Sequence, residues 1–326
     1  MKKHAIIVLT AVSLGWPGLA QDVPAMPKGY ADAMSIVGKT GDFKDNVLKL
    51  SVPRSDLKVT VDGVETPTAF GFGGWIAMTK GDGGKDVMMG DLVLLQDEVN
   101  PVMSALLDNG LEVTALHNHF FWEQPRIFYM HVHGYGTASD LARRVKAALD
   151  LIGKIKVREA QSAERSAPGG AVAGTIDTAK IDRIVGHNGD RNGAVYKITI
   201  GRSDLNVKEM GATINSRMGL NTWAAFFGSD DNAVVAGDVA MLENEVTPVL
   251  KALRKNDLNV VAIHHHMIGA RPMIIFLHYW GKGTTEKLAT GIRAVLSEIG
   301  KPVGQAGGMP MGGDANPGQA SETGKL

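Results

Sequence analysis

Eight of the ten histidines in this chain of 326 residues lie in two corresponding segments. They are His117, His119, His131 and His133 in the first segment, and His264, His265, His266 and His278 in the second. Imidazole is the commonest metal ligand in proteins. Cysteine is absent, so His, Asp, Glu, Met or backbone groups would have to hold any metal. The clustering therefore predicts a transition-metal site, and zinc, copper, iron and nickel all accept imidazole.

The spacing of the histidines fits a β-hairpin. Residues two apart in a strand share a face, which would bring His117 and His119 to one face of a strand over 112–121. A hairpin centred on Pro125 would place His119 opposite His131 and His117 opposite His133, with Cβ atoms about 5 Å apart. The second segment predicts the same geometry, with Trp280 in place of His133.

We expect these hairpins to supply the metal ligands. The predicted ligands are His117, His119, His131, His133, His264, His266 and His278. The second repeat would either complete the shell of the first or build another. The alternative is a buried network in which the imidazoles bond to Asp or to backbone groups. Two aligned copies of the pattern favour the metal site.

Four duplicated carboxylates are candidate partners of the imidazoles or acid–base groups. They are Asp91, Glu98, Asp238 and Glu245. Asp91 and Asp238 each follow a glycine, and they either orient metal-bound imidazoles or are ordinary turn residues. Glu98 and Glu245 stand near predicted helix starts, where the helix dipole favours a negative charge, and we favour that structural interpretation for them. Arg54–Asp56, repeated as Arg202–Asp204, is expected to be a structural ion pair or turn.

The chain carries an internal duplication. Arg54-Ser55-Asp56-Leu57 recurs as Arg202-Ser203-Asp204-Leu205, an offset of 148 residues, and Gly90-Asp91 recurs as Gly237-Asp238, an offset of 147. Residues 90–136 share 20 identities in 47 aligned positions with 237–283. One residue is therefore missing from a hairpin of the second copy. We expect a first repeat over 30–153 and a second over 178–300.

Within a repeat the hydrophobic period switches between that of strands and that of helices. Strands are expected over 48–52, 73–79, 87–95, 112–121 and 127–133. Helices are expected over 99–107, with Pro101 in the first turn, and over 141–152 after a Thr137–Asp140 capping box. The fold class predicted is α+β: two tandem units, each with helices on a mostly antiparallel sheet, related by a pseudo-twofold axis.

The segments outside the repeats have distinct compositions. Residues 1–20 resemble a secretory signal, with Lys2 and Lys3 before the short apolar run 5–14 and small residues before Gln21. The expected location is the periplasm or the cell exterior, with no lipid anchor because no Cys follows the run. Residues 154–177 read as a linker, and 301–326 as a Gly- and Pro-rich disordered tail.

The overall composition excludes some partners. Lys plus Arg and Asp plus Glu both number 34, and this balance argues against a nucleic-acid-binding protein. A small molecule remains the expected partner, and Trp75, Trp122, Trp223 and Trp280 are candidate cleft residues. No serine-hydrolase elbow, H-E-x-x-H motif or dinucleotide fingerprint is present.

The sequence also resembles a known family. Gly90-Asp91, Glu98-Val99, the run from Val113 to His119, Pro125, and His131-Val132-His133-Gly134 are similar to the LppY/LpqO family of bacterial exported proteins and lipoproteins. The resemblance covers both repeats and implies export and a duplicated domain of unknown function. It implies no activity and no catalytic residues.

Two functions remain open at this point. The first is a periplasmic transition-metal protein, and, if it is an enzyme, a hydrolase in which metal-bound water attacks a small substrate. The second is a non-catalytic module that clasps a small ligand or partner between the repeats, with histidines as hydrogen-bonding groups.

Overall fold

The computed structural model describes residues 25–155 and 174–301. The predicted signal segment, most of the predicted linker and nearly all of the predicted tail lie outside these residues. No helix in the described residues is both long and apolar enough to cross a membrane.

The first repeat consists of a six-stranded sheet, a small three-stranded sheet and three α-helices. Its elements are α1 (Lys28–Val37), β1 (Gly41–Lys44), β2 (Val47–Pro53), β3 (Val59–Val61), β4 (Val64–Thr66), η1 (Thr68–Phe70), β5 (Gly73–Lys80), η2 (Asp82–Gly84), β6 (Asp86–Leu95), α2 (Gln96–Asp108), β7 (Glu112–His117), β8 (Glu123–Gln124), β9 (Ile127–Gly136) and α3 (Ala138–Leu149).

The second repeat follows the same order. Its elements are α4 (Thr178–Val185), β10 (Asp190–Asn192), β11 (Val195–Gly201), β12 (Lys208–Glu209), β13 (Ala212–Thr213), η3 (Ser216–Met218), β14 (Asn221–Gly228), β15 (Ala233–Met241), α5 (Glu243–Lys255), β16 (Asn259–His264), β17 (Ile275–Gly283) and α6 (Thr285–Leu296).

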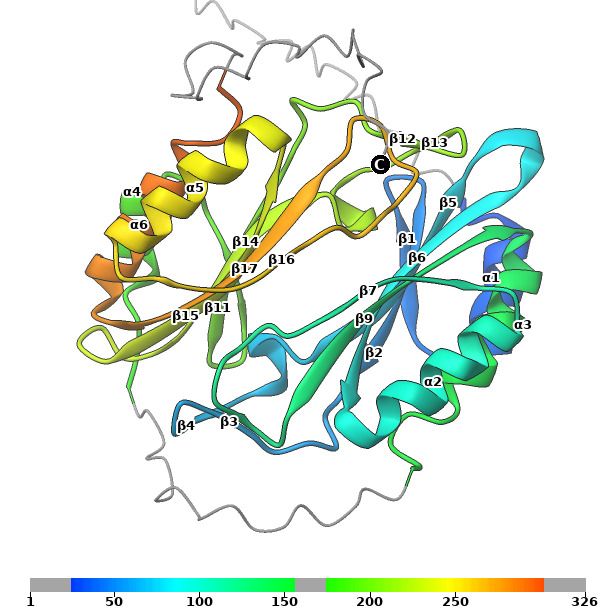
Figure 1. Cartoon of the computed structure of the whole chain (residues 1–326), viewed down its shortest axis with the longest axis horizontal. Helices are drawn as coiled ribbons and strands as arrows, with labels where there is room; N and C mark the ends of the chain where they lie inside the picture. The colour runs from blue at the N-terminus through cyan, green and yellow to red at the C-terminus, as the bar shows by residue number, and fades with distance from the viewer. Residues whose placement is uncertain (1–24, 156–173, 302–326) are drawn as a thin grey trace, which may run out of the picture.

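The two large sheets have one topology. Their strand orders are β1-β2-β5-β6-β9-β7 and β10-β11-β14-β15-β17-β16, and every pairing is antiparallel. Helices α1, α2 and α3 cover the outer face of one sheet and α4, α5 and α6 that of the other (Figure 1). The inner faces lie toward each other. The predicted α+β class with two tandem units is therefore confirmed.

Each outer layer has its own hydrophobic core. In the first repeat Leu50 and Ile76 of the sheet and Leu141 and Val145 of α3 share one buried cluster, and the second repeat has an equivalent cluster. Between the sheets, two further clusters join side chains of both repeats, for example Phe70 with Trp280 and Val47 with Phe276. Successive side chains of a strand point to opposite faces of the sheet. One face therefore packs in the core under the helices, and the other packs in the core between the repeats.

The sequence predicted the main strands and missed parts of the N-terminal edge. The offset change is confirmed in the β5–β6 hairpin, which is one residue longer than the β14–β15 hairpin. Helix α1 and strand β1 were not predicted. Pro101 was wrongly placed in the first helical turn, because α2 begins at Gln96 and Pro101 is its sixth residue.

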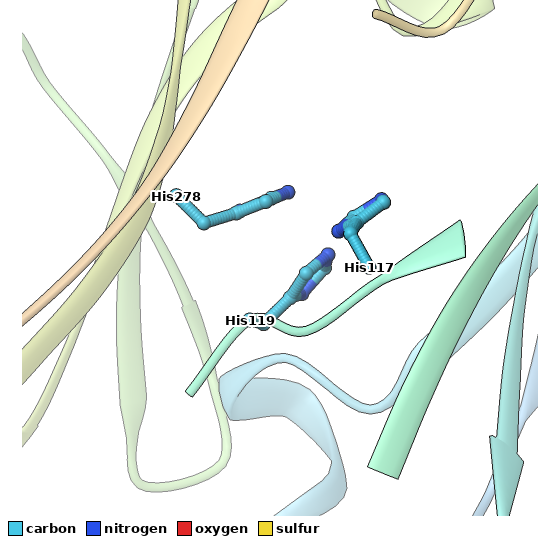
Figure 2. A group of neighbouring side chains, drawn as sticks. All are labelled: His117, His119 and His278. Carbon is cyan, nitrogen blue, oxygen red and sulfur yellow. The ribbon is translucent and has the colours of Figure 1, made fainter. Parts of the chain in front are cut away.

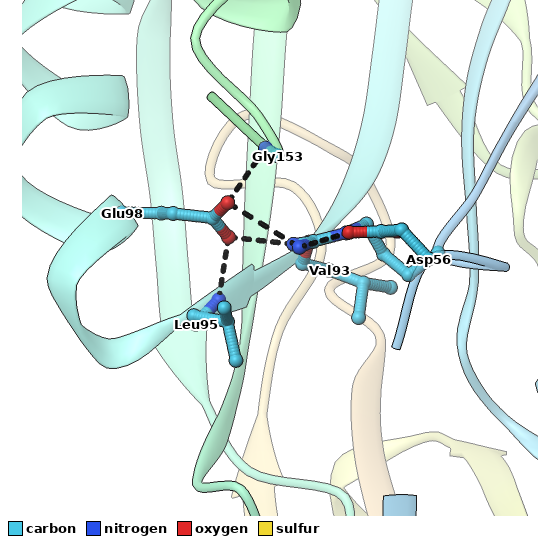
Figure 3. A network of polar contacts seen from close by, with 6 residues as sticks. Asp56, Val93, Leu95, Glu98 and Gly153 are labelled. Atoms are coloured by element: carbon cyan, nitrogen blue, oxygen red, sulfur yellow. Dashed lines mark hydrogen bonds and ion pairs between the residues drawn. The ribbon is translucent and has the colours of Figure 1, made fainter. Parts of the chain in front are cut away.

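A buried ion pair ties the start of α2 to the sheet, and Figure 3 shows its contacts. Arg54 Nη1 donates to Glu98 Oε2 at 2.6 Å and to the Val93 carbonyl at 2.9 Å. Glu98 also accepts from the backbone N–H groups of Leu95 and Gly153, both at 2.7 Å. Arg54 and Glu98 are almost fully buried, so each charge depends on the other. The second repeat forms the same network, with Arg202 and Glu245 at its centre.

Candidate metal centre

Six histidines from both repeats converge between the two sheets. His117 ends strand β7 and His264 ends β16, while His131 and His278 lie within β9 and β17. His119 and His266 come two residues after the ends of β7 and β16. The strands therefore fix four imidazoles, and the loops that follow β7 and β16 carry the other two.

The predicted register of the histidine hairpin is wrong. His117 pairs with Tyr129, and Ala115 pairs with His131. Strand β7 ends at His117 because the chain then leaves the sheet and forms β8, which pairs with β3. The register differs from the predicted one by an even number of residues, so His117 and His131 still share a face. The second repeat has the same pairing, with His264 opposite Phe276 and Ala262 opposite His278.

The contacts between the repeats are reciprocal. The ring centroids of His119 and His278 lie 3.6 Å apart, and those of the equivalent pair, His266 and His131, lie 4.0 Å apart. His117 and its own equivalent, His264, are 3.8 Å apart. Contacts in which i meets j and j meets i are the mark of a twofold arrangement. The histidine cluster thus lies where the pseudo-twofold relation brings equivalent residues together.

Hydrogen bonds orient two of the imidazoles toward the cluster. His131 Nδ1 lies 3.3 Å from the Gly90 carbonyl, and His278 Nδ1 lies 3.2 Å from the Gly237 carbonyl. A carbonyl accepts a hydrogen bond, so Nδ1 carries the proton and Nε2 presents its lone pair. This is the way proteins fix metal-binding histidines. Gly237 has to be glycine, since a Cβ there would stand 2.1 Å from the Tyr279 hydroxyl.

Eight other imidazole nitrogens of the six histidines are buried and have no hydrogen-bond partner, whereas His117 Nδ1 lies 3.4 Å from the Asn118 carbonyl. The buried, unpaired nitrogens are His117 Nε2, both ring nitrogens of His119 and of His264, His131 Nε2, His266 Nδ1 and His278 Nε2. Leaving a buried polar atom unpaired costs about 1–3 kcal/mol, so such a concentration within one cluster requires an explanation. A bound ion that accepts these lone pairs supplies one.

The electrostatics keep these imidazoles neutral, as metal ligands must be. Burial lowers the pKa of His117 to about 4. Burial, assisted by the neighbouring imidazoles, holds the pKa of His119, His131, His266 and His278 well below the usual range. The cluster therefore favours the binding of a metal cation, which requires neutral imidazole nitrogens, over the binding of protons.

Two groups of three histidines have ligand atoms close enough together to bind one metal ion. His117, His119 and His278 form the first, and His117, His131 and His264 the second; within each triad the ligand atoms lie within 4.8 Å of one another. Figure 2 shows the first triad, with His278 reaching across from the opposite sheet toward His117 and His119. Because His117 belongs to both triads, the two describe alternative shells for one ion. Each shell contains residues of both repeats.

His133 does not join either triad. Its Nδ1 lies 3.3 Å from Glu112 Oε2 and its Nε2 lies 3.4 Å from Glu209 Oε1, a buried carboxylate of the second repeat. Burial opposes the charged imidazole, but the nearby carboxylate of Glu209, with help from that of Glu112, raises the pKa of His133. The residue forms an ionic contact between the repeats.

The four predicted carboxylates divide into two pairs. Asp238 Oδ2 lies 3.7 Å from His266 Nε2 and 4.0 Å from His278 Nε2, and Asp91 is half-buried and lines the same cavity as Asp238. Burial raises the pKa of Asp91 to about 8. Glu98 and Glu245 instead belong to the arginine networks at the helix starts, which agrees with the structural interpretation of these two residues.

A cavity of about 590 Å³ opens beside the cluster, and both repeats line it. His119, His266 and His278 form part of its wall, together with Asp91 and Asp238. Of the four candidate tryptophans, Trp75 and Trp223 line the cavity, Trp122 is 59% exposed and Trp280 is buried in the core. The cavity gives a small molecule access to three of the six histidines.

Sequence reasoning missed two lysines of this cavity. Lys49 on β2 and Lys197 on β11 also line it, 148 residues apart in the sequence. The available signal was a lysine between two apolar residues at the same position of both repeats. Such a lysine sits on the face opposite to the helix-covered core.

The low pKa values predict that acid destabilises the metal-free protein. The folded cluster stays neutral down to about pH 4 at His117, whereas the unfolded chain takes up protons below about pH 6.5. Stability is therefore present above about pH 6.5 and falls as the pH drops toward 4. Thermal unfolding of chelator-treated protein between these values measures the effect. A melting temperature independent of pH over this interval would contradict it.

Comparisons with known proteins identify the domain. The family described as "Domain of Unknown Function (DUF1259)" matches residues 31–151 and 179–298, which together make up most of the chain. No curated protein matches the chain.

Two solved structures are similar over most of the chain. A trimeric bacterial microcompartment shell protein, PduB, is 11% identical, with 79% of this chain and 89% of that chain covered and a TM-score of 0.20. EtuB from Clostridium kluyveri is 10% identical, with 80% and 89% covered and a TM-score of 0.19. At such TM-scores these likenesses carry no argument about fold or function.

Proposed function

This chain belongs to the family defined by that domain of unknown function, which it carries twice, and we propose that it is a metal-dependent hydrolase of small molecules. The observation that carries the proposal is the buried triad of His117, His119 and His278, whose members come from both repeats and have unpaired nitrogens. Three imidazoles with room for a further ligand are typical of catalytic metal sites.

The position of the triad supports a catalytic role. His119 and His278 both face the cavity, so an ion held by them would be open to a substrate. A bound transition metal lowers the pKa of a coordinated water and polarises a carbonyl or phosphoryl oxygen. Burial raises the pKa of Asp238, which lies beside His266 and His278, and we propose it as the general acid that protonates a leaving group.

The metal is a first-row transition ion bound through nitrogen. The cluster has only imidazole donors in its triads, which suits zinc, copper or iron.

An activity assay tests the hydrolase proposal. We expect metal-loaded protein to hydrolyse at least one member of a panel of chromogenic carboxylic and phosphoric esters. Activity should vanish after chelation and in His278→Ala, and persist in His265→Ala, a neighbouring histidine outside both triads. If the metal-loaded protein hydrolyses no ester faster than the chelated protein does, the hydrolase proposal is wrong.

The cavity also favours a second candidate, a non-catalytic module that binds a small ligand between the repeats. The volume of the cavity lies within the range of ligand pockets, about 300–1,000 Å³, and both repeats line the cavity. In this case the histidines would act as hydrogen-bonding groups. Ligand binding that is unaffected by chelation, without any hydrolysis, would favour this candidate.

We further propose that the chain is an exported member of the LppY/LpqO family. The family motifs from Gly90 to Gly134 and the positively charged start before the apolar run 5–14 support this. Amino-terminal sequencing of protein recovered from the periplasm checks it, with Gln21 as the expected first residue.

A further inference from the structure

Two lysines of the cavity have no charged partner. Lys49 and Lys197 are half-buried and line the cavity from β2 and β11. Their Nζ atoms lie over the rings of two tryptophans, Lys49 at 4.4 Å from Trp75 and Lys197 at 4.1 Å from Trp223. Neither ammonium group forms a hydrogen bond or an ion pair with a residue of 25–155 or 174–301. The pseudo-twofold relation thus places two unpaired cations in one cavity.

The carboxyl groups of the same cavity do not neutralise these cations by contact. Asp91 and Asp238 line the cavity, yet neither lies within ion-pair distance of Lys49 or Lys197. A half-buried ammonium without an ionic partner is costly unless a ligand pairs with it. Burial, followed by the charge of Lys197, lowers the pKa of Lys49 to about 8, which leaves it mostly protonated at pH 7. The cavity is therefore suited to an anion.

The rest of the wall is partly apolar and partly polar, with Ser51, Ser55, Thr68, Asn192 and Asn221 among its residues, which suits a polar organic ligand. Trp75, Trp223, Pro53 and Ala69 contribute apolar surface. Gly71, Gly73 and Gly74 also line the cavity and add no side chain to its wall. Such a cavity offers two cationic groups, each beside the apolar surface of a tryptophan ring.

We propose that Lys49 and Lys197 bind a small dicarboxylate that bridges the two repeats next to the histidine cluster. One carboxylate pairs with each ammonium group, and the carbon chain lies against the tryptophan rings. The role of the dicarboxylate as a substrate or product of the metal centre rests on the proposed function. Binding itself requires only the lysines.

The test uses succinate as the probe, with tryptophan fluorescence and calorimetry as readouts. We expect succinate to bind the wild-type protein and to change the emission of Trp75 and Trp223 by displacing the lysines from the rings. Lys49→Met and Lys197→Met should each weaken binding at least about tenfold, since one charge-assisted hydrogen bond contributes about 1.5–3 kcal/mol and 1.4 kcal/mol is a factor of ten. The double variant should not bind.

The controls separate the site from general electrostatics. Lys85 also lies over an aromatic ring, that of Tyr135, but outside the cavity, so Lys85→Met should leave succinate binding unchanged. Lys49→Arg keeps the charge and should retain binding, which excludes misfolding as the cause of a loss. Equal binding by wild type and the double variant, or no binding by wild type, would overturn the inference. Binding of inorganic phosphate in preference to succinate would overturn the dicarboxylate class.

The outcome can be separated from that of the metal proposal. Metal content of each lysine variant should equal that of the wild type, because no lysine belongs to a triad. Succinate binding by a chain that takes up no metal would support the dicarboxylate site and contradict the metal centre. Metal uptake without succinate binding would do the reverse.

Discussion

If the cluster is a metal site, His117→Ala should lower the affinity of the chain for a transition metal by more than about 100-fold, because loss of groups that merely orient metal ligands already costs about 10–100-fold. His117 is the residue common to both triads, so its removal leaves no shell of three imidazoles among the described residues. Metal titration of chelator-treated protein, followed by dialysis and elemental analysis, measures the loss.

Two matched variants sharpen this prediction. His265→Ala alters a neighbouring histidine that belongs to neither triad and should bind metal as the wild type does. His264→Ala removes a ligand of one triad only and should reduce affinity less than His117→Ala. Unchanged metal affinity in a folded His117→Ala protein would contradict the assignment of the cluster as the metal site.

Arg54→Met should destabilise the fold by about 3–5 kcal/mol, because it leaves the buried charge of Glu98 without its cationic partner. Two backbone N–H groups would still bond Glu98 but cannot neutralise it. Denaturant unfolding of purified protein measures the change. The metal content of the folded variant should not alter, since the network lies outside the triads.

Compensation distinguishes this explanation from a simple loss of packing. Arg54→Met combined with Glu98→Leu removes both charges and should recover most of the lost stability. Asp56→Asn affects a side chain that is half exposed, and we expect at most about 1 kcal/mol. A double variant as unstable as Arg54→Met alone would show that the lost charge pairing is not the cause.

The sequence was sufficient for the repeat architecture because each strand and helix carries its own periodicity. Strand β2 alternates apolar and polar residues over most of its length, β6 is apolar over most of its length, and Thr137 caps α3 as the capping box predicts. Helix α1 was missed because it begins directly after Pro27 and has no side-chain N-cap. The edge strand β1 has no buried residue, so it left no hydrophobic pattern.

The site was predictable in its residues and not in its geometry. Duplication marked the histidines, and strand alternation placed His117 and His131 on a common face. The register prediction failed because the register depends on the pairing of β8 with β3, in which Val61 lies opposite Glu123, 62 residues away in the sequence, and no local pattern reveals this contact. The mixing of the repeats within each triad, and the pairing of His133 with Glu209, arise from how the two sheets pack.

Elemental analysis of the native protein, purified without chelators, tests the metal centre most directly. The structure predicts about one zinc, copper or iron ion per chain, as a single shell of three or four ligands requires. Chelation should remove it and titration should restore it. A native protein that contains none of these ions and takes up none on titration would contradict the metal centre, and the six histidines would then serve the packing of the two repeats.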